Sequence, residues 1–209
     1  MFDDPSGGGT TLLSAPLFVF VPSPPTGPGF VVAIPVRDEE ERLPACLRAL
    51  ARQRDRLGQA MPPTLVRVVV FANNCADRSA SLARKLGTGL SLDIRVVEAR
   101  LPPATAHAGA ARRAAMDLAE AWLVEAGEKD GVILTTDADS QVAPNWIAEN
   151  LASFETGAEA VLGRIDTTPW SPFARPWRAR HGAGICDDCT AMAALLLIKT
   201  GRPKLGSQS

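Results

Sequence analysis

The stretch Gly131-Val-Ile-Leu-Thr-Thr-Asp-Ala-Asp-Ser140 decides how the rest of the chain is interpreted. An apolar run from Val132 to Leu134 is followed by two carboxylates one residue apart, Asp137 and Asp139. This order is typical of a buried strand that ends in an acidic loop. Ligands of open α/β sheets bind outside the carboxyl ends of the strands, so acids there can hold a divalent cation against a phosphate. The alternative is an Asx turn that starts the next helix.

Apolar runs alternate with amphipathic patterns on both sides of this stretch. Strands are expected at 30–34, 65–71, 92–97 and 132–135, with 160–163 as a candidate fifth, and helices at 43–50, from about 78 to 87, at 108–126 and at 144–154. Asp38 is a predicted N-cap of the first helix, and Gly87 a predicted stop of the second. Such alternation predicts an α/β fold with a mostly parallel, Rossmann-like sheet flanked by helices.

Composition indicates the boundaries of this domain, and charge bears on its partners. We expect a flexible Pro/Gly-rich leader at 1–29, one nucleotide-binding domain at 30–165, and an irregular region at 166–209. With 22 basic and 23 acidic residues the net charge is −1, so the chain has no overall basic field for nucleic acid.

Cysteine content and hydropathy bear on the location of the protein. The four cysteines are too sparse for a secreted disulfide framework, and no signal peptide is evident. The longest apolar run, Ala191 to Ile198, is far shorter than the roughly 20 residues that span a bilayer. We therefore expect a cytoplasmic protein without a transmembrane segment, either free or peripheral to a membrane.

Polar clusters follow three more of the predicted elements. Pro35, Arg37 and Glu39 come after the first strand, where they form either a nucleotide pocket wall or an acidic turn that caps a helix. After the second strand, Asn73, Asn74 and Asp77 are candidates to hydrogen-bond a nucleobase, or form a turn with Asp77 as N-cap.

The start of the long helix is the next candidate. Gly109 would permit close approach, and Arg112 or Arg113 could reach a diphosphate, the alternative being two solvated arginines on an exposed face. Further on, His181 and Cys186-x-x-Cys189 suggest zinc or a redox dithiol, but an ordinary loop is favoured because no second ligand pair exists.

Together these clusters resemble the family 2 glycosyltransferases, which have the GT-A nucleotide-diphospho-sugar transferase fold. The resemblance covers residues 31–165. Val32-Ala-Ile-Pro-Val-Arg-Asp-Glu-Glu40 resembles the opening strand of the family, with Arg37 and Asp38 where Tyr and Asn are usual. Phe71-Ala-Asn-Asn-Cys-Ala-Asp77 resembles its Asp-Asp-Gly-Ser-x-Asp motif, with Asn73 and Asn74 replacing the acids. Ala108 to Arg112 is similar to its Gly-x-x-x-Ala-Arg-Asn segment, and Leu134 to Ser140 to its metal-binding Asp-x-Asp.

The resemblance implies an inverting glycosyltransferase with a nucleotide-diphospho-sugar donor. Asp137 and Asp139 would hold Mg²⁺ or Mn²⁺ and the diphosphate, Arg112 the phosphates, and the clusters after the first two strands the nucleoside. The acceptor, a glycan, a lipid or a small molecule, is not identified. The C-terminal acceptor region is shorter than is usual in the family, and Asp187 and Asp188 are its only acidic pair and so the candidates for a general base.

Two other functions remain open. One is a truncated or inactive relative that binds the nucleotide sugar without transferring it. The other, a nucleotidyltransferase, is disfavoured because it would need a glycine-rich basic loop where Arg37-Asp-Glu-Glu-Glu41 stands.

Overall fold

A computed structural model of the 209-residue chain describes residues 29–104, 106–163 and 197–199. The general-base candidates Asp187 and Asp188 and the Cys186–Cys189 motif lie outside the described residues. The same holds for nearly all of the expected leader and of the region 166–209.

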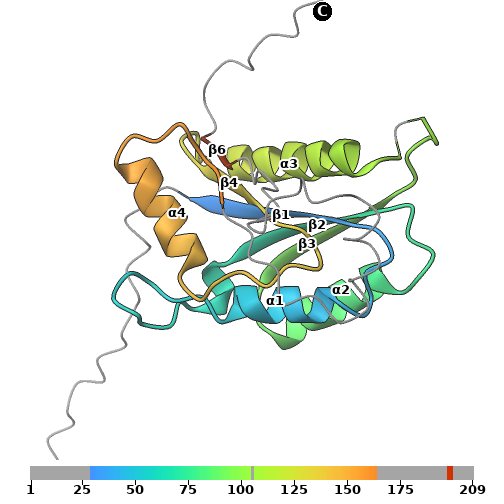
Figure 1. Ribbon diagram of the computed structural model, residues 1–209, viewed down its shortest axis with the longest axis horizontal. Coiled ribbons are helices and arrows are strands. Elements are labelled where there is room, and N and C mark those ends of the chain that lie inside the picture. The colour runs from blue at the N-terminus through green and yellow to red at the C-terminus, as the bar shows by residue number, and fades with distance from the viewer. Residues whose placement is uncertain (1–28, 105, 164–196, 200–209) are drawn as a thin grey trace, which may run out of the picture.

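The described part of the chain contains a six-stranded sheet with the order β3-β2-β1-β4-β6-β5 (Figure 1). The strands are β1 Phe30–Val36, β2 Arg67–Asn73, β3 Asp93–Ala99, β4 Val132–Thr135, β5 Ala160–Val161 and β6 Leu197–Lys199. β3, β2, β1 and β4 run parallel, as predicted. β6 was not predicted, and it lies between β4 and β5, antiparallel to both. Three residues are too few to show an alternating pattern in the sequence. The position of this strand depends instead on partners more than 30 residues away.

Helices cover both faces of the sheet. They are α1 Leu43–Ala51, α2 Ser79–Gly89, α3 Ala108–Glu125 and α4 Trp146–Glu155, with a 3₁₀ turn, η1, at Pro63–Leu65. Figure 1 shows α3 on one face of the sheet and α1 and α2 on the other. Among these helices, none is both long and apolar enough to cross a lipid bilayer.

β1 lies at the centre of the core, and its side chains alternate between the two faces. Val32, Ile34 and Val36 pack in the cluster that contains buried residues of α1, α2 and α4. Val31 and Ala33 pack in the second cluster, against the alanine-rich face of α3. The predicted apolar stripe of α1 is confirmed, because its members are all fully buried: Leu43, Cys46, Leu47 and Leu50.

Asp38 does not cap α1, contrary to the prediction. Arg42 stands at the N-cap position, without a side-chain cap. Asp38 instead has a φ of 55°, and its carboxylate accepts hydrogen bonds from the backbone N–H groups of Ala76 at 2.6 Å and Asp77 at 3.3 Å. The loop after β1 is thereby joined to the loop after β2, a long-range contact that no local pattern contains.

Gly87 does not end α2 either, since the helix continues to Gly89. Gly87 is buried where α2 crosses β3, and a Cβ placed on it would lie 2.1 Å from Cγ2 of Ile94. The glycine is needed for close packing of helix on strand rather than for a helix stop.

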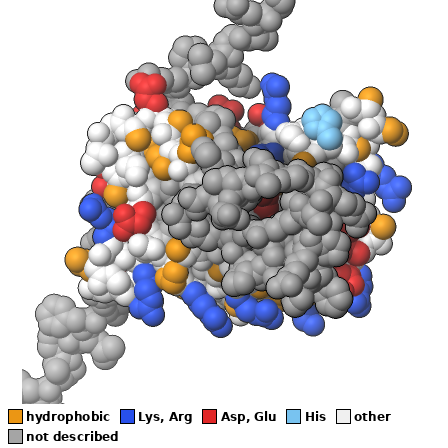
Figure 2. All heavy atoms as spheres, viewed as in Figure 1, with side chains coloured by type: hydrophobic (Ala, Val, Ile, Leu, Met, Phe, Trp, Pro, Cys, Tyr) orange, Lys and Arg blue, Asp and Glu red, His pale blue; other side chains and the backbone are white. Residues whose placement is uncertain are grey.

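The surface carries its charge unevenly despite the net charge of −1. Figure 2 shows Lys and Arg side chains one after another along the lower edge of the view, over α1 and α2. Large apolar side chains are exposed at few places, and among the described residues these are Leu57, Leu65, Val124 and Leu162.

The Gly87→Ala substitution should lower the free energy of unfolding. The added methyl group overlaps Ile94, and overpacking of this kind costs about 1–3 kcal/mol. This cost exceeds the gain of up to about 1 kcal/mol that alanine brings to a helix. Gly89→Ala is the matched control, because nothing lies within 4 Å of its added Cβ. Urea denaturation measures both variants, and a Gly87→Ala midpoint at or above that of the wild type would contradict the packing role.

Candidate functional site

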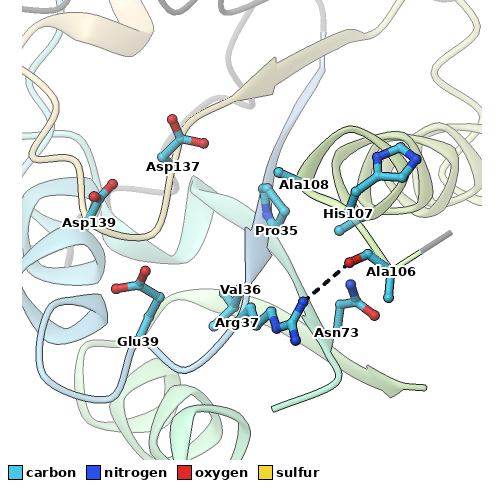
Figure 3. A pocket seen from close by; sticks show the side chains of 11 residues that line it. Pro35, Val36, Arg37, Glu39, Asn73, Ala106, His107, Ala108, Asp137 and Asp139 are labelled. Carbon is cyan, nitrogen blue, oxygen red and sulfur yellow. Dashed lines mark hydrogen bonds between the residues drawn. The ribbon is translucent and has the colours of Figure 1, made fainter. Parts of the chain in front are cut away.

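A cavity of about 400 Å³ lies at the carboxyl ends of β1, β2 and β4, next to the N-terminus of α3 (Figure 3). It is the place at which an open parallel sheet binds its ligands. The cavity is lined by Pro35, Val36, Arg37, Glu39, Asn73, Ala106, His107, Ala108, Ala111, Asp137 and Asp139.

The register of the sheet brings these segments together. Val32 of β1 is paired with Val68 of β2 on one side and with Leu134 of β4 on the other. β4 ends at Thr135, opposite Ala33, and the N–H of Thr136 still donates to the carbonyl of Ala33 at 3.3 Å. β1 continues beyond that point, so the acidic loop after β4 runs past the polar end of β1.

The acidic side chains gather on one side of the cavity. Figure 3 shows Asp137 and Asp139 on the loop after β4, with Glu39 below them on the loop after β1. Asp139 is about half exposed, whereas Glu39 is only 17% exposed. These carboxylates are hard oxygen ligands of the kind that Mg²⁺ and Mn²⁺ bind.

Each of these three acids has an arginine nearby. Arg112 of α3 donates from Nη2 to Oδ1 of Asp137. Arg42 donates from Nε and Nη2 to the two carboxylate oxygens of Glu39, at 2.7 and 2.9 Å. The same guanidinium lies 3.8 Å from Oδ2 of Asp139.

The opposite side of the cavity is formed by amide, basic and backbone groups. Arg37 donates from Nη1 to the carbonyl of Ala106 at 3.2 Å, which joins the end of β1 to the start of α3. His107 is the N-cap of α3, and its Nδ1 accepts a hydrogen bond from the N–H of Ala110 at 3.2 Å. The positive end of the dipole of this 18-residue helix therefore faces the cavity.

The two adjacent asparagines have different surroundings. Asn73 lines the cavity and is 2% exposed, and its Oδ1 has no hydrogen-bond partner in the described part of the chain. Asn74 has a φ of 52° and bonds twice to the backbone of Leu101, donating at 3.1 Å and accepting at 2.9 Å. Asn73 is thus available to a ligand, while Asn74 holds the loop after β3.

Asp77 supports the loops rather than lining the cavity. Its Oδ1 accepts from the N–H and Oγ of Ser79, and its Oδ2 accepts from the N–H of Glu40 at 2.9 Å. Burial acts to raise the pKa of Asp77, but the hydrogen bonds from Ser79 and Glu40 outweigh it and the net pKa is lowered. The N–H of Arg78, followed by its guanidinium, lowers the pKa of the Glu40 carboxyl in the same network.

A group of three possible metal-ligand atoms also lies in these loops. Atoms of Asp38, Cys75 and Asp77 all lie within 4.8 Å of one another. Cys75 donates to the carbonyl of Val36 at 3.5 Å, and both carboxylates accept backbone N–H groups. Hydrogen bonding between the loops accounts for the cluster.

Cys46 lies under the acidic loop and remains a thiol. Burial, with the charges of Asp139 and Asp137, raises the pKa of Cys46 to about 12. Its Sγ donates to the carbonyl of Asp137 at 3.6 Å, so the side chain supports the backbone of this loop.

Four buried side-chain atoms have no hydrogen-bond partner within the described residues. They are Asn73 Oδ1, Arg112 Nε, Thr135 Oγ1 and Thr136 Oγ1. The atoms of Asn73, Thr135 and Thr136 lie at the carboxyl ends of β2 and β4. Arg112 lies on α3, and its guanidinium pairs with Asp137. A buried polar group left without a partner costs about 1–3 kcal/mol, so each of these atoms would gain from a hydrogen-bond partner.

Six of the predicted site residues line the cavity: Pro35, Arg37, Glu39, Asn73, Asp137 and Asp139. Arg112 reaches it through Asp137. Gly109 is exposed in the first turn of α3, and among the described residues a Cβ there would meet the ring of His107.

Five lining residues were not predicted as site residues: Val36, Ala106, His107, Ala108 and Ala111. Four of them lie in the first turn of α3 or just before it, and the small apolar residues among the five carry no chemical pattern. The one usable signal was the position of His107 immediately before a helix.

Comparison with known proteins agrees with this architecture. The sequence profile described as glycosyl transferase family 2 matches residues 31–203. No curated protein matches the chain significantly.

Solved structures are similar to part of this chain. S. aureus TarS 1–349 in complex with UDP has a TM-score of 0.50 at 21% identity, covering 69% of this chain and 39% of that one. The mannosyltransferase PcManGT from Pyrobaculum calidifontis, in complex with GDP-Man and Mn²⁺, has a TM-score of 0.46 at 22% identity, covering 74% and 40%. The chain thus spans about two fifths of the length of these structures. By its profile match and its GT-A fold, the chain belongs to glycosyl transferase family 2.

Proposed function

We propose that this chain binds a nucleoside diphosphate sugar in the cavity at the carboxyl edge of the sheet. We further propose that the sugar is transferred to an acceptor with inversion, assisted by Mg²⁺ or Mn²⁺. The observation that carries the proposal is the division of the cavity into an acidic side and an amide and basic side, in a chain of this family.

The two sides match the two ends of such a donor. The Oδ1 of Asn73 has no hydrogen-bond partner among the described residues and can accept from a ligand. Arg37 borders the same side, so the nucleoside would lie there. The N-terminus of α3 lies on this side too, where a diphosphate is stabilised by the helix dipole and by unpaired N–H groups. UDP in the TarS structure is consistent with a nucleoside diphosphate as the ligand.

Asp137 and Asp139 fit a divalent cation on the acidic side. Their carboxylates lie at the cavity wall and offer hard oxygen ligands. Next to them in the sequence, the buried Oγ1 atoms of Thr135 and Thr136 have no hydrogen-bond partner among the described residues. A bound cation would offset the charge on the departing nucleoside diphosphate.

Transfer requires a base that deprotonates the acceptor hydroxyl. One observation about the cavity favours a second candidate function, which is donor binding without transfer. Each carboxylate at the cavity has an arginine within 4.0 Å, so no acid of the described residues there is without a cationic neighbour. We therefore propose that the base comes from the region 166–209, with Asp187 and Asp188 as candidates. If that region supplies none, the chain binds a donor without transferring the sugar.

A panel of nucleotide sugars should raise the melting temperature, and Mn²⁺ should increase the effect. A ligand at 100 times its dissociation constant adds about 2.7 kcal/mol of stability. Asp139→Ala should abolish the metal-dependent part, because the cation loses one of its two carboxylates.

Asp130→Ala is the control for this experiment, since the residue is exposed and precedes β4 at the opposite edge of the sheet. If no nucleotide sugar gives a metal-dependent shift in the wild type, the donor site is wrong. Release of free sugar from the responding donor then separates a transferase from a binder.

The neighbouring asparagines provide a second prediction. Asn73→Ala should weaken binding of UDP or GDP, whichever stabilises the protein more, by about 5-fold, the effect of a hydrogen bond of about 1 kcal/mol. Asn74→Ala should instead lower the free energy of unfolding by about 1–3 kcal/mol, because both bonds to Leu101 are lost. Isothermal titration and urea denaturation of both variants measure the difference. Equal nucleotide affinity in Asn73→Ala and the wild type would exclude the base contact.

A further inference from the structure

The two aspartates of the proposed metal site both face arginines. Arg112 is paired with Asp137, and Arg42 lies 3.8 Å from Asp139. The positive charges that neutralise these acids are thus supplied by the protein itself. A cation that binds the same oxygens must compete with them.

The two arginines are not equivalent. Arg42 is 60% exposed and already forms a two-fold contact with Glu39, so its approach to Asp139 is a secondary one. Arg112 and Asp137 are only 28% and 34% exposed, and solvent screens their attraction less. The pair between α3 and the acidic loop is therefore the stronger competitor.

Arg112 also has hydrogen-bonding capacity that its present contact does not use. Its Nε is buried and has no partner among the described residues. A guanidinium can bind two oxygens of a phosphate group side by side. Asp137, to which it is bound, lines the cavity, so a diphosphate in that cavity would meet this guanidinium.

We propose that Arg112 changes partners when the donor binds, leaving Asp137 for the oxygens of the diphosphate. Asp137 is then free to bind the divalent cation. Metal and nucleoside diphosphate consequently bind with positive coupling, and Arg112 is the positioning residue that transmits it. This inference rests on the proposed function, because it needs both ligands in the cavity.

Thermodynamic linkage makes the coupling measurable from either ligand. If UDP raises the affinity for Mn²⁺ by some factor, Mn²⁺ raises the affinity for UDP by the same factor. In the wild type we expect weak binding of Mn²⁺ alone and a tightening of roughly 5- to 150-fold when UDP is present.

Arg112→Gln is the main test, with electron paramagnetic resonance of free Mn²⁺ as the readout and the Mn²⁺–UDP complex in solution taken into account. Without its competitor, Asp137 should bind Mn²⁺ alone roughly 5-fold more tightly, and the tightening by UDP should shrink by at least the same factor. Activity is not needed for this measurement.

Arg113→Gln is the matched control. It removes the same charge from the next residue of α3. That side chain is 78% exposed, and its ion pair with Asp117 is long, at 4.0 Å. Arg112→Lys keeps the charge but cannot bind two phosphate oxygens side by side, so it should fold and show reduced coupling. Inorganic diphosphate should reproduce most of the tightening in the wild type, and uridine none, which tests the exchange without any substitution.

The outcomes separate the two proposals. If the wild type binds Mn²⁺ and UDP but Arg112→Gln behaves as Arg113→Gln does, the exchange is wrong and the donor site remains. Uridine acting as well as diphosphate would also overturn the exchange. A wild type that binds neither UDP nor Mn²⁺, alone or together, would overturn the proposed function and this inference with it.

Discussion

Parallel pairing of β1 with both of its neighbours is the constraint on which the rest of the structure depends. Val32 is paired with Val68 and with Leu134, and this double register places the ends of three strands at one edge. Residues separated by about 100 positions in sequence thus share one cavity. Because both faces of β1 are covered by helices, a shift of one residue would exchange the side chains of two packed clusters.

Hydrogen bonds between loops, in addition to the sheet, join the segments that form the cavity walls. Asp38 and Asp77 accept N–H groups across the loops after β1 and β2, and Asn74 holds Leu101. On the other side, buried Gln53 at the end of α1 donates to Ala143 and accepts from Ile147, which positions the chain after the acidic loop. Several polar residues whose spacing suggested ligand binding therefore hydrogen-bond one loop to another.

Unmet polar groups are concentrated where the ligand is proposed to bind. The atoms of Asn73, Thr135 and Thr136 that have no partner among the described residues, and the pair of Arg112 with Asp137, all lie at the same edge of the sheet. A folded chain tolerates such groups only if the rest of the core supplies the stability that they cost. The fully buried aliphatic residues of β1, β4 and α1 provide that core.

Apolar runs and their endings were enough to predict four parallel strands, four helices and the acidic loop, because buried central strands and amphipathic helices have local periodicity. Six of the cavity residues were predicted for a related reason, since the end of each strand is marked by a change from apolar to polar residues. Three features depended on contacts between distant segments: the antiparallel strand β6, the close packing at Gly87, and the different roles of Asn73 and Asn74. Only the tertiary structure decided these, because the energy of each contact depends on a partner that the neighbouring residues do not specify.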